Sequence, residues 1–203
     1  MRLYTRQHKH SLYELERCGR IINKEIYVRL HMAKDADYFS ERYRIFVQMA
    51  EKRLPRPADS DYPIWCGISK QTALVPDEEQ VLYCLNVPDD HLILFDGLKW
   101  DYVLNYLYVP LNDADNATFQ QDVKALGVSD SFQFFYGRYA HLFPAMEERI
   151  ANSWERIFTI DSMSPIRTQA NLWEIRQEWI EAIIHPGESL QTKTASFPDY
   201  FGE

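Results

Sequence analysis

The chain has 203 residues, a formal net charge of −8 at pH 7, and 14% aromatic residues. A chain of this length can bury one sizeable core without disulfides or metal, and its acidic balance excludes non-specific nucleic-acid binding as an expected role. The longest apolar runs fall far short of the roughly 20 residues that a membrane helix needs. Since the first residues also lack the apolar stretch of a signal peptide, we expect a cytoplasmic protein outside the membrane.

Three cysteines, Cys18, Cys66 and Cys84, are odd in number and form no Cys-x-x-Cys pair. This pattern argues against a disulfide framework and a structural zinc site, and we expect reduced, mostly buried thiols. His8 and His10 lack a third ligand, so no metal site is predicted. The sequence contains no glycine-rich phosphate loop, no Gly-x-Ser-x-Gly elbow and no His-Glu-x-x-His motif.

The N-terminal part of the chain begins with a predicted strand at Arg2–Gln7 and a predicted helix at Ser11–Cys18. Ser11 and Glu14 have the spacing of a capping box, and Gly19 is placed to end the helix in the left-handed conformation. Apolar residues recur at helical spacing from Asp37 to Leu54, which predicts the longest helix.

The middle of the chain alternates between strands and helices. Strands are predicted at Tyr62–Ile68, Gln80–Val87 and His91–Phe95. A helix is predicted at Leu98–Leu107, and the polar run Asn112–Asn116 is predicted to be a loop.

Helices dominate the next segment, and strands return near the end. The aromatic residues of Phe132–Leu142 share one helical face, and Pro144 suits the first turn of a further helix that runs towards Ile157. Ile166–Ile175 has strand character and Trp179–Ile184 is a last short element.

The order of elements predicts an α+β fold, in which several helices pack on a small mixed or antiparallel sheet. A doubly wound parallel sheet is the alternative. We expect one compact domain over residues 1–185 and a polar, mobile tail over residues 186–203.

A series of short motifs follows the same order as in a known family: Leu3-Tyr4-Thr5-x-Gln7, Met49 to Pro57, Tyr62-Pro63-Ile64-Trp65, Val87-Pro88-Asp89-Asp90, Trp100-x-x-Val103-Leu104-Asn105, Ser153-Trp154-x-x-Ile157-Phe158 and Gln169-Ala170-x-x-Trp173-Glu174. Together they resemble the uncharacterised bacterial and phage domain-of-unknown-function family 3841, over nearly all of residues 1–180. That family has no established activity, so the resemblance leaves the function open.

The order of elements is also similar to that of small ADP-ribosyltransferases, in which a first strand bears Arg or His and a late strand bears a catalytic Glu. This resemblance implies NAD as the cofactor and Glu174 as the catalytic acid. It implies Arg6, or Arg2, as the cationic first-strand group, and Tyr62 or Trp65 as the aromatic that stacks on nicotinamide. The chain departs from the pattern, because it has no Ser-Thr-Ser motif and no closely spaced Gln/Glu-x-Glu. Core packing for the aromatics and solvent exposure for Glu174 are the competing interpretation.

A non-enzymatic interaction protein is the alternative function. Such a protein, for example a phage counter-defence or anti-CRISPR inhibitor, would dock a basic partner surface, with exposed aromatics such as Trp100 or Tyr102 as anchors. The sequence leaves open whether the chain is an enzyme. Binding of NAD would favour the transferase, and salt-sensitive capture of a basic protein would favour the interaction protein.

Overall fold

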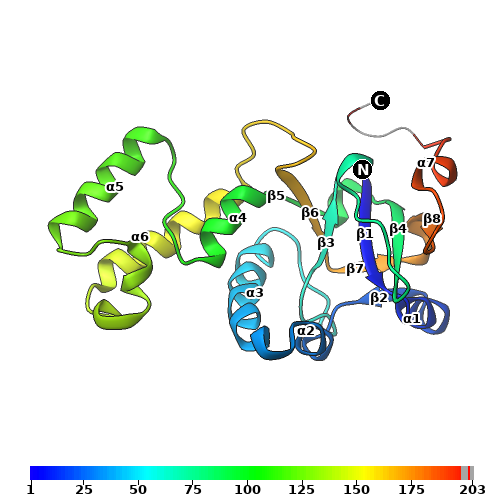
Figure 1. Ribbon diagram of the computed structural model, residues 1–203, viewed down its shortest axis with the longest axis horizontal. Coiled ribbons are helices and arrows are strands. Elements are labelled where there is room, and N and C mark those ends of the chain that lie inside the picture. Colours follow the sequence, from blue (N-terminus) through cyan, green and yellow to red (C-terminus); the bar gives the residue numbers. More distant parts are fainter. Residues whose placement is uncertain (198–200, 202–203) are drawn as a thin grey trace. The chain divides into compact units, whose positions relative to one another are not determined.

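The computed structural model describes residues 1–197 and residue 201 (Figure 1). The chain divides into two compact units. The first, which we call the sheet unit, consists of Met1–Leu94 and Ser162–Glu203, and the second, the inserted unit, consists of Phe95–Asp161. The fold is α+β, as predicted, whereas a domain boundary at residue 185 stays a prediction.

A six-stranded antiparallel sheet has the strand order β5-β6-β3-β1-β4-β8, and its residues belong to the sheet unit except Phe95 and Asp96 at the end of β5. Its strands are β1 (Arg2–His8), β3 (Ile64–Gly67), β4 (Gln80–Asn86), β5 (Ile93–Asp96), β6 (Thr168–Leu172) and β8 (Ile180–Ile184). Tyr4 of β1 lies opposite Gly67 of β3, and Gly67 lies opposite Gln169 of β6. The first strand and a late strand therefore flank β3, and residues distant in sequence become neighbours.

A second, two-stranded sheet pairs β2 (Arg20–Ile22) with β7 (Glu174–Arg176). The continuous strand predicted at Ile166–Ile175 is therefore wrong, because β6 ends at Leu172 and β7 begins two residues later in the other sheet. Trp173 lies at the break, where its indole Nε1 donates a hydrogen bond to the carbonyl oxygen of Leu54 at 2.9 Å. This contact is made where the chain passes from one sheet to the other.

The helices of the sheet unit are α1 (Ser11–Cys18), α2 (Glu25–Met32), α3 (Ala36–Ala50) and the short α7 (Leu190–Lys193). Gly19 ends α1 with a φ of 68°, which confirms the predicted left-handed cap. The capping box is wrong, because His10 is the N-cap and the Ser11 hydroxyl instead lies 2.8 Å from the Tyr83 hydroxyl. The Ser11 side chain thus contacts Tyr83, a residue distant in sequence, instead of capping α1 as its spacing predicted.

The core of the sheet unit follows the alternation of its strands. Leu3, Ile64 and Tyr83 are buried on one face with residues of β6 and β7, while Tyr4 and Cys84 belong to a smaller buried cluster. Two of the predicted buried thiols, Cys66 and Cys84, are indeed buried, but Cys18 is exposed.

The segment predicted to be a mobile tail contains α7 and further contacts. The Lys70 ammonium donates hydrogen bonds to the carbonyl oxygens of Thr194 at 3.0 Å and Phe197 at 2.8 Å. The mobility of residues 186–203 stays a prediction, and its last part, residues 198–200 and 202–203, lies outside the described residues.

The inserted unit contains α4 (Gly97–Leu104), α5 (Asp113–Ala125) and α6 (Pro144–Ser153), followed by the 3₁₀ turn Trp154–Phe158. The loop predicted at residues 112–116 is wrong. Asn112 is the N-cap of α5, and its side-chain oxygen accepts a hydrogen bond from the Asp115 backbone N–H at 2.9 Å. The run of Asn and Asp is therefore a cap and an acidic first turn, the arrangement that helix N-termini favour.

The aromatic segment between α5 and α6 is not the helix that its spacing predicts. It forms two 3₁₀ turns, Ser131–Phe134 and Gly137–Tyr139. Gly137 with φ of 80° and His141 with φ of 60° take the left-handed conformation, which interrupts a continuous helix. Pro144 does occupy the first turn of α6, as predicted.

No helix among the described residues combines the length and apolar character needed to cross a membrane. A cytoplasmic location stays a prediction.

Candidate functional site

A cavity of about 400 Å³ lies in the sheet unit, at neighbouring parts of β1, β3 and β6. We call it the β1–β3–β6 cavity. Its walls are Tyr4–Arg6, Trp65–Gly67, Thr72–Leu74 and, before and at the start of β6, Pro165, Ile166, Thr168 and Gln169. The strand pairing that places Tyr4 and Gln169 on either side of Gly67 explains why these segments meet.

Polar contacts within β1 and from β1 to β3 hold the lining residue Thr5 in place. The Thr5 hydroxyl donates a hydrogen bond to the Trp65 carbonyl oxygen at 2.8 Å, and the Gln7 amide donates to the same hydroxyl at 2.8 Å. Because Thr5 is buried and both bonds are short, this part of the wall is fixed before any ligand arrives.

Arg6 supplies the charge of the cavity. Its Nη1 donates a hydrogen bond to the Val75 carbonyl oxygen at 3.3 Å, and its other N–H groups have no partner among the described residues. None of the described residues that line the cavity is Asp or Glu. The cavity is therefore suited to an anion, since a guanidinium can bind a phosphate or carboxylate with two parallel hydrogen bonds.

Trp65 supplies an aromatic wall. The ring is half-buried and packs against two aromatic rings of α3, with centroid distances of 5.3 Å to Tyr43 and 5.0 Å to Phe46. Burial raises the pKa of Tyr43 above its ordinary value, as expected for a ring packed among the aromatic side chains of this cluster. The indole is thus held in place by packing from outside the cavity.

Tyr62 and Glu174 are not among the residues that line this cavity. Tyr62 is buried beside Tyr43, with ring centroids 5.9 Å apart, and its hydroxyl has no hydrogen-bond partner among the described residues. Of the residues predicted to form one site, the structure therefore brings together Arg6 and Trp65 only. Arg2 also has another role, because its Nε binds Glu181 Oε2 at 2.8 Å.

Glu174 lies in the β2–β7 sheet between two arginines. Arg20 Nη1 donates to its Oε2 and Arg176 Nε donates to its Oε1, both at 2.7 Å. Burial raises the pKa of Glu174, but these two hydrogen bonds outweigh that effect and hold the pKa below its ordinary value. The carboxylate is thus ionised and paired.

Gln169 is the late-strand residue that does line the cavity, and sequence reasoning did not select it. Its side-chain amide makes no hydrogen bond to another described residue and is half-buried. The signal that identifies it is its register opposite Gly67, which only the folded sheet provides.

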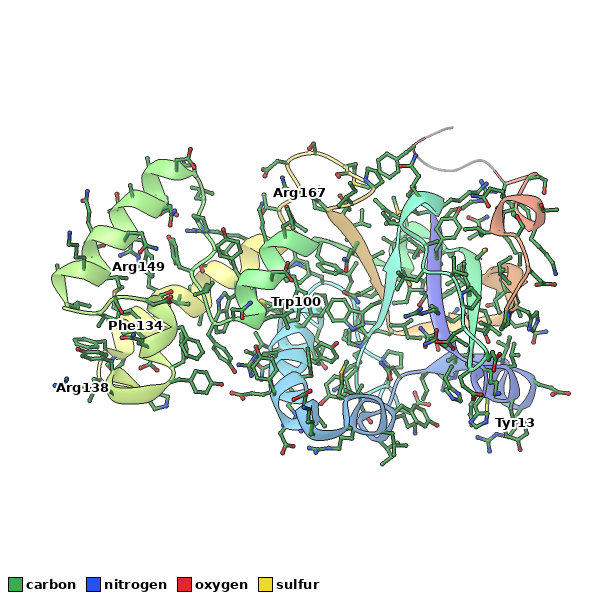
Figure 2. All side chains as sticks on the ribbon, in the orientation of Figure 1. Tyr13, Trp100, Phe134, Arg138, Arg149 and Arg167 are labelled. Carbon is green, nitrogen blue, oxygen red and sulfur yellow. The ribbon has the colours of Figure 1, made fainter. Side chains whose placement is uncertain are left out.

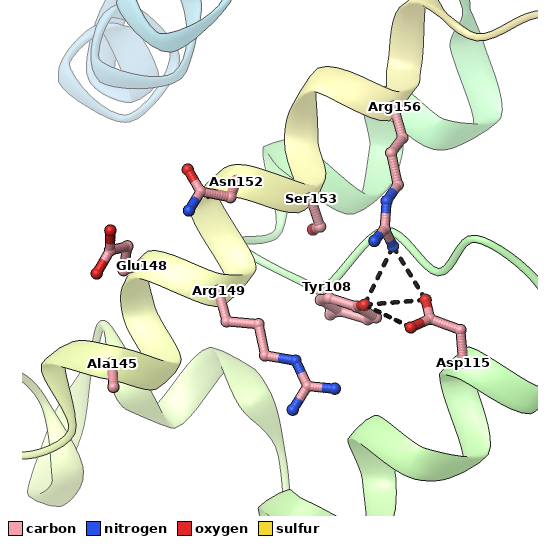
Figure 3. A pocket seen from close by; sticks show the side chains of 8 residues that line it. All are labelled: Tyr108, Asp115, Ala145, Glu148, Arg149, Asn152, Ser153 and Arg156. Atoms are coloured by element: carbon pink, nitrogen blue, oxygen red, sulfur yellow. Dashed lines mark hydrogen bonds and ion pairs between the residues drawn. The ribbon is translucent and has the colours of Figure 1, made fainter.

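The inserted unit has a cavity of its own, of about 470 Å³, between α5 and α6 (Figure 3). Arg156 Nη1 lies 3.1 Å from the Tyr108 hydroxyl and 3.0 Å from Asp115 Oδ2, and Tyr108 donates to the same carboxylate. Arg149 pairs with Asp122 at 2.6 Å. Both arginines thus face carboxylates, so this network neutralises its own charges and links the helices.

Trp100 lies on α4 (Figure 2). It was expected to be an exposed anchor for a protein partner but is only 5% exposed, so that part of the interaction hypothesis is wrong. Tyr102, on the same helix α4, is 42% exposed. The helical spacing of α4 explains the difference, because residues two positions apart point in different directions.

Comparison with protein-family models identifies a family to which this α+β chain is similar. A family model described as "Domain of unknown function (DUF3841)" matches residues 2–181. The chain belongs to this family, which confirms the resemblance found in the order of motifs. Curated proteins and solved structures give no match.

Proposed function

We propose that the sheet unit binds NAD or a related nucleotide in the β1–β3–β6 cavity. The observation that carries this proposal is the meeting of Arg6 and Trp65, from two neighbouring strands, in one cavity whose described lining holds no carboxylate. A cation beside an aromatic wall suits a ligand with a phosphate and a planar ring.

The size and the polar groups of the cavity support the same ligand class. Its volume of about 400 Å³ lies within the range of roughly 300–1,000 Å³ typical of small-molecule sites. Thr72 and Gln169 supply a hydroxyl and an amide to the lining. These are the few convergent polar groups that orient a ligand within a mainly apolar pocket.

An ADP-ribosyl transfer step needs a group that supports positive charge developing on the ribose. Glu174 was expected in this role from the order of elements, but it is paired with two arginines and does not line the cavity. The late-strand side chain in the described lining is that of Gln169, whose neutral amide oxygen supports positive charge more weakly than a carboxylate does. Turnover is therefore the second question, after binding, and Gln169→Ala is the variant that tests it.

The deciding experiment is a calorimetric titration of the purified chain with NAD, accompanied by thermal unfolding at several NAD concentrations. A ligand present at about 100 times its Kd adds about 2.7 kcal/mol of stability if it binds the native state alone. Arg6→Ala should weaken binding about 10- to 100-fold, because a hydrogen bond to a charged group contributes about 1.5–3 kcal/mol.

Arg17→Ala is the matched control, since Arg17 is an exposed arginine of the same unit that does not line the cavity. Its Kd for NAD should equal that of the unsubstituted chain. Absence of binding at millimolar NAD, or equal weakening by both substitutions, would overturn the proposal and lead to capture of a basic partner instead.

A further inference from the structure

Exposed large apolar side chains lie in the lining of the β1–β3–β6 cavity and directly next to it along the chain. Leu74 is 59% exposed, Val75 76% and Ile166 75%. Leu74 and Ile166 both line the cavity. Single exposed aliphatic side chains need no explanation, but a group of them around one opening indicates a surface that is covered when a ligand is bound.

The loop that carries Ile166 is closed at its base. The Thr168 N–H donates to the Ser164 carbonyl oxygen at 2.9 Å, and the Ser164 N–H donates to the Thr168 hydroxyl at 3.0 Å. Pro165 restricts the backbone between these bonds. The loop therefore presents Ile166 outward from a fixed base.

The loop that carries Leu74 is anchored on both sides. Before it, the Ser69 hydroxyl accepts a hydrogen bond from the Gln71 N–H at 3.1 Å and caps the 3₁₀ turn Lys70–Thr72. After it, the Val75 carbonyl oxygen accepts the hydrogen bond from Arg6. The cation of the cavity and the exposed Leu74 are thus positioned by the same short segment.

We infer that Leu74 and Ile166 form an apolar clamp for the planar ring of an aromatic anion whose charged group binds Arg6. This inference rests on the proposed function, because the same cavity holds the ligand. It adds the chemical class of the ligand and assigns Leu74 and Ile166 to its selection. An aromatic anion is the occupant that the lining favours, because Arg6 is its single charged group among the described residues and the clamp is apolar. A sugar phosphate without an aromatic ring would leave both aliphatic side chains in water.

The test uses the fluorescent aromatic anion anilinonaphthalene sulfonate as the probe, with NAD and ribose phosphate as competitors. The double variant Leu74→Ala/Ile166→Ala should bind the probe about 10- to 100-fold more weakly than the unsubstituted chain. Arg6→Ala should weaken it as well, and ribose phosphate should compete poorly. Leu30→Ala is the control, because Leu30 is 73% exposed on α2 of the same unit and does not line the cavity.

The outcomes distinguish a failure of the clamp proposal from a failure of the NAD-binding proposal. Saturable probe binding that depends on Leu74, Ile166 and Arg6 supports the clamp even if NAD does not compete, and in that case only the nucleotide proposal fails. Equal NAD affinity in the double variant and the unsubstituted chain overturns the clamp and leaves NAD binding intact. Absence of saturable probe binding, or a double variant that changes only self-association measured by light scattering, also overturns the clamp.

Discussion

Glu174 accepts a hydrogen bond from Arg20 across the β2–β7 pair, with Oε2 2.7 Å from Nη1. Arg20 lies opposite Arg176 in the register of the two strands, and Arg176 donates to the other oxygen of Glu174. One buried carboxylate thus separates two guanidinium groups that would otherwise repel each other. The side chain predicted to be a catalytic acid has the surroundings of a structural anchor for the small sheet.

Glu174→Gln should lower the free energy of unfolding at pH 7 by about 1–3 kcal/mol, because hydrogen bonds to a buried charge are lost. The folded pKa of Glu174 lies below the ordinary value of 4.5. The stabilisation is therefore present above about pH 4.5 and is lost as the pH falls through the folded pKa. Denaturant unfolding of both proteins at several pH values measures this, and their stabilities should converge in acid.

The control for that substitution is Glu178→Gln, since Glu178 is exposed and has no ion-pair partner among the described residues. It should leave the unfolding midpoint unchanged. If Glu174→Gln retained full stability and instead abolished a measurable turnover of NAD, the anchor role would be refuted and the catalytic role supported.

The three thiols should differ sharply in reactivity. Burial raises the pKa of both Cys66 and Cys84 to about 12, whereas Cys18 is exposed. Since the thiolate is the reactive form, Ellman's reagent should label one thiol of the native chain rapidly and all three after denaturation. Rapid labelling of a Cys18→Ser variant would contradict this burial.

Tyr108→Phe should destabilise the inserted unit by about 1–2 kcal/mol, because the hydroxyl hydrogen-bonds to a charged carboxylate. The hydrogen bond from the backbone N–H of Leu111 has the largest effect in lowering the pKa of Asp115. The contacts of Asp115 with Tyr108 and Arg156 lower this pKa further. Removal of the hydroxyl should therefore move the pKa of Asp115 upward, which carboxyl chemical shifts can follow. Tyr102→Phe serves as the control on an exposed ring, and an equal loss in both variants would argue against the network.

Trp100→Ala should cost about 3–5 kcal/mol of stability, as expected for truncation of a large buried aromatic. Tyr102→Ala should cost less, about 1 kcal/mol, because Tyr102 is 42% exposed and its truncation returns less buried apolar surface to water. Chemical denaturation distinguishes the two. A stable Trp100→Ala variant that had lost the ability to capture a basic partner would restore Trp100 as an interaction anchor.

Asn112→Ala should reduce stability by about 1 kcal/mol, since it removes the N-cap of α5. Asn116→Ala, within the same helix, is exposed and should have little effect or a slightly favourable one. Thermal unfolding followed by circular dichroism compares them. Identical behaviour of the two variants would mean that the cap does not hold the helix start.

Local signals determined much of the fold. The helical spacing of Asp37–Leu54 predicted α3, although the helix ends at Ala50, earlier than the predicted Leu54. Gly19 and Pro144 marked a helix end and a helix start correctly. These features depend on periodicity and on backbone conformations that one or two residues control. The order of short motifs likewise identified the family.

Features that depend on distant partners were decided by the tertiary structure alone. Ser11 does not cap α1, and its hydroxyl lies beside that of the distant Tyr83. The late strand is divided at Trp173, whose indole N–H donates to the carbonyl oxygen of the distant Leu54. The candidate site depends on the same kind of information. Sequence order pointed to Glu174, whereas strand pairing placed Gln169 opposite Gly67, in the lining that also holds Arg6 and Trp65. Pairing register, and not distance along the chain, determines which side chains share a cavity.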